Sequence, residues 1–232
     1  MMDKDAIAKD VESISQVIQD NSAFLLANIK DGYNEVVEFI QDAWDFDVLF
    51  IKKGNWDYYY NKFSMVYFGS HVLLPLSFAI RVDLLLSNIP ACFFELRLIL
   101  ESMGKCYFSD LRYKEQVHFM EKLESLEKKM NSKKSKTSIS RLLREMGPDY
   151  EALWKRLSEE WLHTESFVRR ILEETLRKGD IPAYALASPI SYNEADIDII
   201  RELCASVSKF RALLKETVDR WNREIGKQIK DS

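Results

Sequence analysis

The scarcity of helix breakers is the feature that most constrains the fold of this chain. Its 232 residues include only 7 glycines and 5 prolines, whereas a chain built from many β-turns needs more of both. Leu, Glu, Lys and Ile are abundant, and apolar residues recur at helical spacing rather than in alternation. We therefore predict an all-α bundle of about eight helices, with helix 91–130 as its long central element.

Composition limits the class of protein. The chain is 47% hydrophobic and 30% charged, which is enough to bury the core of one large domain or two small ones. Its net charge of −4 gives no overall basic signal for nucleic acid. Three cysteines, none in a Cys-x-x-Cys pair, argue against a disulfide framework or a structural zinc site. We predict a cytoplasmic protein and assign it no metal and no cofactor.

The stretch Phe63–Ile80 has to be tested as a membrane span, because it contains no Asp, Glu, Lys or Arg. A spanning helix needs about 20 strongly apolar residues. Here the run is interrupted by polar residues and a proline, and charges follow at once at Arg81 and Asp83. We therefore predict a buried core helix and no membrane partner, and the amphipathic N-terminus does not resemble a signal peptide.

Short breaker sequences indicate where the first helices end. Asp31 and Gly32 form a typical C-cap, so we expect the first helix to reach about Ile29. The second helix should end near Gly54. Pro90 suits the first turn of the long helix, because the N–H that proline lacks has no partner there.

The two halves of helix 91–130 differ. The first half carries an apolar seam with 3-4-3-4 spacing, which predicts a core contact. The seam residues are Phe93, Leu96, Leu100, Met103 and Tyr107. The second half, 114–130, is highly charged, so we expect it to project toward solvent or to form a self-association or partner surface.

The segment 131–138, rich in serine and lysine, is predicted to be a flexible linker. It divides the chain into an N-terminal helical part, 1–130, and a C-terminal helical part, 139–232. We expect the two parts to pack together as a single domain.

Within the C-terminal part, we predict short helices at 139–146 and 149–162, separated by a glycine and a proline. The final helix should begin at Asn193, because Asp196 three residues later is typical of an N-terminal cap. It should end near Lys230.

Arg156 and His163 are the candidate catalytic residues. Seven residues make two helical turns, so both would share one face with Glu160. In acid–base chemistry on a phosphodiester, His163 would move the proton and Arg156 would hold the developing charge. The alternative is an ordinary Arg156–Glu160 ion pair with a histidine at the helix end.

The Arg156-x6-His163 spacing resembles the Arg-x4–6-His motif of HEPN-domain proteins, which are all-helical. Many of those proteins are metal-independent ribonucleases that work as dimers. The resemblance implies a phosphate-binding role for Arg156 and an acid–base role for His163.

A broader similarity covers roughly residues 91–167. Arg97-x3-Glu101 in an apolar helix, followed by Leu157-Ser158-x4-His163, is similar to a loose set of helical proteins of archaea and bacteria that have no assigned activity. That similarity implies a helical fold, and it suggests that Arg97, Glu101 and His163 converge.

Arg97 and Glu101 also stand out without any resemblance. They lie four residues apart on a helix whose other residues are mostly apolar, and buried charges persist only when they are paired or functional. One interpretation is an ion pair that fixes helix packing. The other is a polar pocket within the bundle, formed by Arg97, Glu101, Ser158 and Glu160.

A di-metal carboxylate site is the third functional hypothesis. The segments 115–118 and 160–163 both read Glu-x-x-His, and two such helical motifs plus a Glu from each of two other helices form a di-iron site. The motif residues are Glu115, His118, Glu160 and His163, and the extra ligands would come from Glu35, Glu38 or Glu145.

A basic stretch surrounds the linker and could contact the backbone of RNA. Its alternative is a solvated linker, because no aromatic side chains interleave with the cations. The candidate RNA contacts are Lys128, Lys129, Lys133, Lys134 and Lys136, with Arg141 and Arg144 beyond them.

The sequence therefore predicts a soluble helical protein that acts as a binding or interaction module, with self-association as a partner hypothesis. A HEPN-like ribonuclease using Arg156 and His163 is the alternative. The glycine-rich, Walker A, His-Glu-x-x-His and Gly-x-Ser-x-Gly signatures are absent from the sequence, which gives no support to nucleotide-driven or α/β-hydrolase chemistry.

Overall fold

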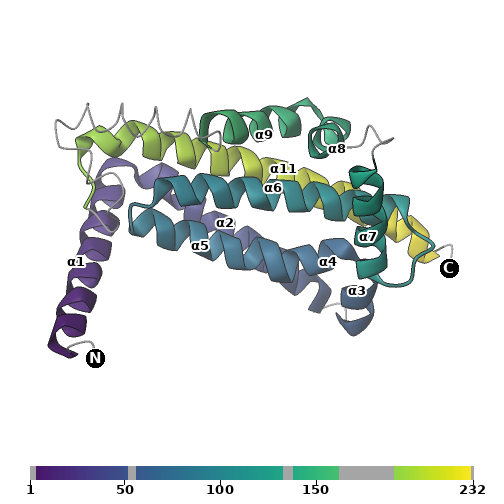
Figure 1. Ribbon diagram of the computed structural model, residues 1–232, viewed down its shortest axis with the longest axis horizontal. Coiled ribbons are helices and arrows are strands. Elements are labelled where there is room, and N and C mark those ends of the chain that lie inside the picture. Colours follow the sequence, from purple (N-terminus) through teal and green to yellow (C-terminus); the bar gives the residue numbers. More distant parts are fainter. Residues whose placement is uncertain (1–3, 52–55, 133–137, 162–190, 231–232) are drawn as a thin grey trace.

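The computed structural model describes residues 4–51, 56–132, 138–161 and 191–230. In these ranges the chain forms helices joined by short turns and contains no strand (Figure 1). The prediction of an all-α bundle of about eight helices is confirmed. The N-terminal elements are α1 (Lys4–Asn28), α2 (Lys30–Ile51), α3 (Trp56–Lys62), α4 (Ser64–Phe68), the π-helical turn η1 (Gly69–Leu73) and α5 (Leu74–Leu85).

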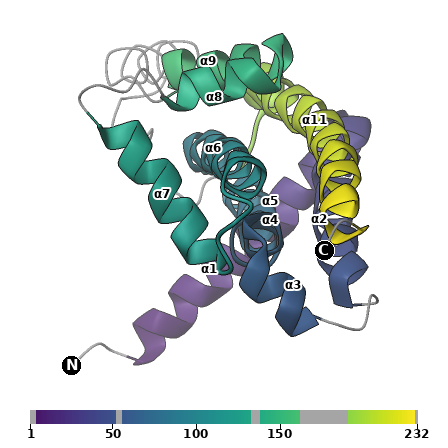
Figure 2. The same cartoon turned by 90° about the vertical axis from the view of Figure 1, so that its right-hand side faces the viewer.

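The remaining elements surround or follow the central helix α6 (Ile89–Arg112). They are α7 (Phe119–Asn131), α8 (Ile139–Met146), α9 (Pro148–Trp161), the short 3-10 turn η3 (Glu194–Asp196) and α11 (Ile197–Lys230). Helix α6 contacts α4, α5, α7, α8, α9 and α11, while α2 packs on α5 and α11 (Figure 2). Elements from both sides of the 131–138 linker therefore share one core.

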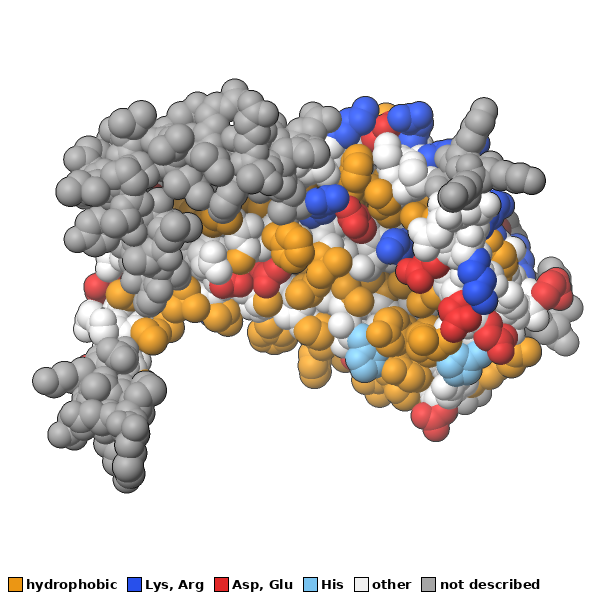
Figure 3. Space-filling model, in the orientation of Figure 1, with side chains coloured by type: hydrophobic (Ala, Val, Ile, Leu, Met, Phe, Trp, Pro, Cys, Tyr) orange, Lys and Arg blue, Asp and Glu red, His pale blue; other side chains and the backbone are white. Residues whose placement is uncertain are grey.

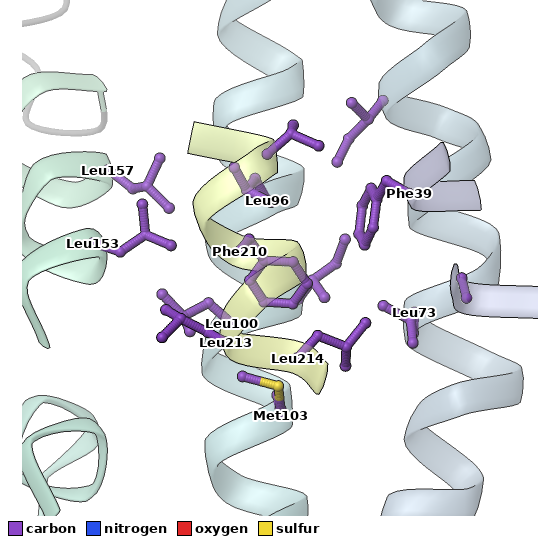
Figure 4. Packing of buried hydrophobic residues seen from close by; sticks show 14 of the residues in the cluster. Phe39, Leu73, Leu96, Leu100, Met103, Leu153, Leu157, Phe210, Leu213 and Leu214 are labelled. Atoms are coloured by element: carbon purple, nitrogen blue, oxygen red, sulfur yellow. The ribbon is translucent and has the colours of Figure 1, made fainter. Parts of the chain in front are cut away.

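The predicted seam of α6 lies at the centre of that core. Leu96, Leu100 and Met103 are fully buried. Figure 4 shows them between side chains of α2, α9 and α11. Those side chains include Phe39, Leu153, Leu157, Phe210, Leu213 and Leu214.

The prediction of one long helix over 91–130 is wrong. Helix α6 ends at Arg112, where Tyr113 adopts φ −120° and ψ 49°, and α7 begins after His118. Neither glycine nor proline occurs between them, so no local signal marks the break. Its cause is tertiary: by turning back, α7 packs on α6 and α4 and buries Phe119, Lys122 and Leu126.

The prediction that Asp31 and Gly32 close the first helix is also wrong. Helix α2 already begins at Lys30, so Gly32 lies in its first turn. A Cβ atom at Gly32 would lie 3.0 Å from the Cβ of Cys204 on α11. The glycine therefore serves the close approach of two helices rather than a helix end.

Two predicted helix boundaries are confirmed. Asn193 accepts a hydrogen bond from the N–H of Ala195 at 2.9 Å, and its own N–H donates to Asp196 at 2.9 Å, which forms a capping box. Helix α8 ends before Gly147, whose φ of 156° is readily adopted only by glycine.

The Ser64–Leu85 stretch is long and apolar enough to cross a membrane when judged by length and composition alone. A core helix of a soluble protein passes the same test. Here α4, η1 and α5 pack against α2 and α6, and Leu73, Ile80 and Leu84 are fully buried.

An arginine joins α2 to α11. Arg211 lies 2.6 to 2.8 Å from the carboxylates of Asp42, Glu35 and Glu38. Burial acts to lower the pKa of Arg211, but the hydrogen bonds that its guanidinium donates to these three carboxylates raise it overall. Glu35 and Glu38, two of the extra ligands of the di-metal hypothesis, are therefore engaged by a cation on α11.

Candidate functional site

Arg97 and Glu101 form an ion pair that extends to α9. The Nε of Arg97 donates to Glu101 at 2.8 Å, and the indole N–H of Trp154 donates to the same carboxylate oxygen at 2.7 Å. The guanidinium also lies 5.6 Å from the centre of the Trp154 ring. Both ionic side chains are about one quarter exposed. The cluster thus joins α6 to α9 at the surface of the core.

The other residues of the predicted polar pocket do not extend this cluster. Ser158 is buried and donates its hydroxyl hydrogen to the backbone carbonyl of Trp154 at 2.7 Å, within its own helix. The side chain of Glu160 and the whole of His163 lie outside the described residues.

Arg156 lies near a different helix from the one that Trp154 contacts. Its guanidinium is 3.4 Å from a carboxylate oxygen of Glu202 on α11, and its side chain is 42% exposed. In the described part of the chain, Arg97 and Glu101 meet Trp154, whereas Arg156 pairs with α11. The pairing of Arg156 with His163, and the ribonuclease hypothesis that depends on it, stay predictions.

The di-metal hypothesis required Glu115 and His118 on one helical face, and that part of it is wrong. Both residues lie in the connection between α6 and α7, where His118 is the N-cap residue of α7 and its Nδ1 faces the N–H of Met120 at 3.3 Å. Among the described residues, no group of three His, Cys, Asp or Glu side chains is placed to hold a metal ion.

The cations near the linker are partly neutralised. Arg144 makes two hydrogen bonds to the carboxylate of Glu151, at 2.7 and 2.6 Å, and these bonds lower the pKa of Glu151 to about 2. Lys128 lies 3.4 Å from Glu124 in an exposed pair. Lys133, Lys134 and Lys136 lie outside the described residues, so Lys128 and Lys129 are the two of the five candidate lysines that the structure describes.

A buried ionic junction, which the sequence did not reveal, lies at the other end of α6. Asp110 is fully buried and accepts hydrogen bonds from the N–H groups of Ser64 (2.8 Å) and Met65 (3.0 Å) and from the indole of Trp221 (3.0 Å). Its remaining partner is the ammonium of Lys122 at 3.4 Å, which is itself 1% exposed. Asp110 thus caps the start of α4 and joins four helices.

Burial and pairing act in opposite directions on this junction. Burial raises the pKa of Asp110, while Lys122 and the three N–H donors act to lower it. Burial lowers the pKa of Lys122, and Asp110 acts to raise it. The ammonium also lies 4.9 Å from the centre of the Phe63 ring. With every charge partnered, the junction is a structural element rather than an open site.

A sequence signal for this junction existed. The 3-4 seam of α6 continues from Tyr107 to Asp110, which places a carboxylate at a core position. In α7, Lys122 stands between Phe119 and Leu126 on the apolar stripe. An acid and a base that each interrupt a core seam indicate a buried pair.

Between α5 and α6 lies a pair of carboxyl groups. Glu95 is hydrogen-bonded to Asp83, and burial followed by repulsion from Asp83 raises the pKa of Glu95 to about 8. Asp83 also accepts from the side-chain amide of Asn88 at 2.9 Å. Glu95 therefore keeps its proton near neutral pH and adds no negative charge beside Asp83.

Exposed apolar side chains flank this pair along both helices. Phe78 and Val82 on α5 are 47% and 51% exposed, and Phe94 and Leu98 on α6 are 52% and 41% exposed. The two apolar residues on each helix are spaced i,i+4, so they form one stripe on that helix. The tight turn between α5 and α6 makes the two helices neighbours. We call these four residues the α5–α6 face. Figure 3 shows apolar side chains, coloured orange, in the part of the molecule where Figure 1 draws α5 and α6.

Comparison of the chain with protein-family models, with curated proteins and with solved structures gave no match. The function therefore has to be argued from the geometry of the sites.

Proposed function

We propose that this chain is a protein-interaction module that binds an amphipathic helix along the α5–α6 face. The observation that carries the proposal is the exposure of four large apolar side chains on two adjacent helices whose other sides are packed in the core. Contiguous exposed apolar surface of this kind marks sites of protein association. Two parallel stripes with a seam between them suit the apolar face of a third helix.

The charges beside the face favour a partner with an acidic flank. Arg81 lies one residue before Val82, and its Nε is buried without a hydrogen-bond partner within the described ranges. The Arg81 side chain as a whole is half-buried, and its positive charge beside Val82 attracts a carboxylate on the incoming helix. The protonated Glu95 removes one charge from the seam between the stripes, which lowers the cost of covering it.

We place this module in the cytoplasm. Cys92, Cys106 and Cys204 are buried free thiols, which is the ordinary state of cysteine in a reducing compartment. Burial raises the pKa of the Cys204 thiol to about 12 and keeps it in its unreactive form.

The proposal is tested with a library of displayed amphipathic helical peptides of about 20 residues, selected on the immobilised parent protein. Fluorescence anisotropy then gives the Kd of the best peptide for the parent and for Leu98→Asp. We expect the substitution to weaken binding at least about tenfold, because it places a carboxylate where the peptide covers apolar surface.

Trp44→Asp is the matched control. Trp44 is 52% exposed and lies on α2, a helix that carries none of the four residues of the α5–α6 face. The control should bind the peptide as the parent does. Equal affinity for the parent and Leu98→Asp, or equal losses in both variants, would contradict the proposal.

A further inference from the structure

Helix α1 projects from the bundle with an uncovered apolar stripe. Figures 1 and 2 show it leaving the body at one end, and we call residues 4–20 the α1 arm. Val11 and Ile14 are 58% and 39% exposed, while Val17 and Ile18 are half-buried. A helical segment that stands alone in water is marginally stable, so this stripe calls for a covering surface.

The base of the arm is held firmly. Leu25 is fully buried, and the amide of Asn21 both donates to the carbonyl of Leu85 (2.9 Å) and accepts from the N–H of Tyr192 (2.7 Å). Phe24 packs on the ring of Tyr192, with centroids 5.8 Å apart. These contacts set the direction in which the arm leaves the body, so the stripe is presented in a fixed orientation.

The stripe has the spacing of a helix-pairing seam. Val11, Ile14 and Ile18 follow the 3-4 pattern, and the pattern continues to Asn21 and Leu25, which are the two residues buried at the base. The arm is therefore the solvent-exposed continuation of a seam that already packs against this fold.

We propose that the α1 arm of a second copy of this chain is the helix that occupies the α5–α6 face, so that each copy donates one arm and accepts one. This inference rests on the proposed function of that face and names its partner. It makes the protein a two-fold symmetric dimer in which both uncovered apolar surfaces are buried.

The arm cannot cover the face of its own copy. Helix α1 is continuous from Lys4 to Asn28 and is anchored at its C-terminal end. At 1.5 Å per residue, Val11 lies about 21 Å along the axis from Leu25, away from the anchoring contacts. Folding back would require the helix to break, whereas a second copy can receive the arm as it stands.

A reciprocal exchange also gives an interface of adequate size. A few turns of one helix cover little surface compared with the roughly 1,200–2,000 Å² that specific interfaces bury. Two-fold symmetry doubles the contact and closes the assembly, so neither a free arm nor a free face is left to extend a chain of copies.

The test measures the mass of the full chain in solution by sedimentation velocity. We expect the parent to be a dimer, and we expect Ile14→Asp (arm) and Leu98→Asp (face) each to be monomeric. A mixture of the two variants should associate more strongly than either variant alone and more weakly than the parent, because only the contact between the intact arm of the second and the intact face of the first is restored. Trp44→Asp should remain a dimer, and circular dichroism should show all variants folded.

Other pairings give different results. If Ile14→Asp dissociates the dimer and Leu98→Asp does not, the arms pair with each other and the inference is wrong. If only Leu98→Asp dissociates it, two faces meet directly, which overturns the role of the arm and leaves the face as a binding surface. A parent that is monomeric at every concentration, yet binds the selected peptide on the face, also overturns the inference while the proposed function stands.

Discussion

Two ionic clusters on α6 are built from the same chemical parts and differ in burial. In each, a carboxylate on α6 accepts a hydrogen bond from an indole N–H and pairs with a cation. Glu101 meets Trp154 at 2.7 Å and Arg97 at 2.8 Å, and Asp110 meets Trp221 at 3.0 Å and Lys122 at 3.4 Å. The first cluster is partly exposed, and the second is excluded from water.

The difference shows that the number of ion pairs says little about how much each pair contributes to stability. Near the surface, water solvates any charge that loses its partner, so the pair contributes little. In the interior, a charge left alone has no such compensation, and removing one partner is strongly destabilising. Asp110 also holds the first N–H groups of α4, where the preceding Phe63 provides no side-chain cap.

The largest expected effect comes from breaking the buried cluster. Asp110→Asn removes the charge that neutralises Lys122 and should lower the free energy of unfolding by about 3–5 kcal/mol. Lys122→Met should cost less, because Asp110 keeps three N–H donors. The double variant should be more stable than the sum of the single losses implies.

Urea unfolding at neutral pH measures all three variants. Asp149→Asn is the matched control, since Asp149 forms an exposed pair with Lys209 at 2.9 Å, and its loss should be small. Equal losses in Asp110→Asn and in the control would mean that burial does not separate the two kinds of pair.

An intermediate effect is expected at Glu95, which is partly buried. Burial, followed by repulsion from Asp83, raises the pKa of Glu95 from the ordinary 4.5 to about 8 in the folded chain. A raised carboxyl pKa means that the folded state binds more protons than the unfolded state between these values. The stability that the protonated Glu95 contributes is therefore fully present below about pH 4.5, and it is lost as the pH rises through about 8.

Glu95→Gln should abolish most of this slope and be more stable than the parent by roughly 1–2 kcal/mol near pH 9, after allowance for partial exposure. Urea midpoints at about pH 5 and about pH 9 check this. A parent whose midpoint is constant over that range would show that Glu95 is ionised throughout.

The smallest effect is expected in the partly exposed cluster. Glu101→Gln removes the charge that pairs with Arg97 but keeps an oxygen that can accept from Trp154. We expect a loss of at most about 1 kcal/mol, reduced further by added salt. A loss as large as that of Asp110→Asn, measured in the same urea titration, would make the exposed cluster energetically equivalent to the buried one.

Many residues of the site could be located from the sequence, but their contacts with other helices could not. The pairing of Arg97 with Glu101 follows from their i,i+4 spacing on one helix, which is local geometry. Their contact with Trp154 does not follow, because it depends on how α9 lies across α6. The contact of Arg156 with Glu202 does not follow from local spacing either, because Glu202 belongs to a helix forty-odd residues further along the chain.

By itself, the sequence determined the helical class, the buried seam of α6 and the ends marked by Gly147 and Asn193, because periodicity and capping act within a few residues. Only the tertiary structure decided that the chain turns between Arg112 and Phe119 and that Gly32 serves close packing against Cys204. Those choices depend on which apolar surfaces and charges from distant segments must be buried together, and no local pattern contains that information.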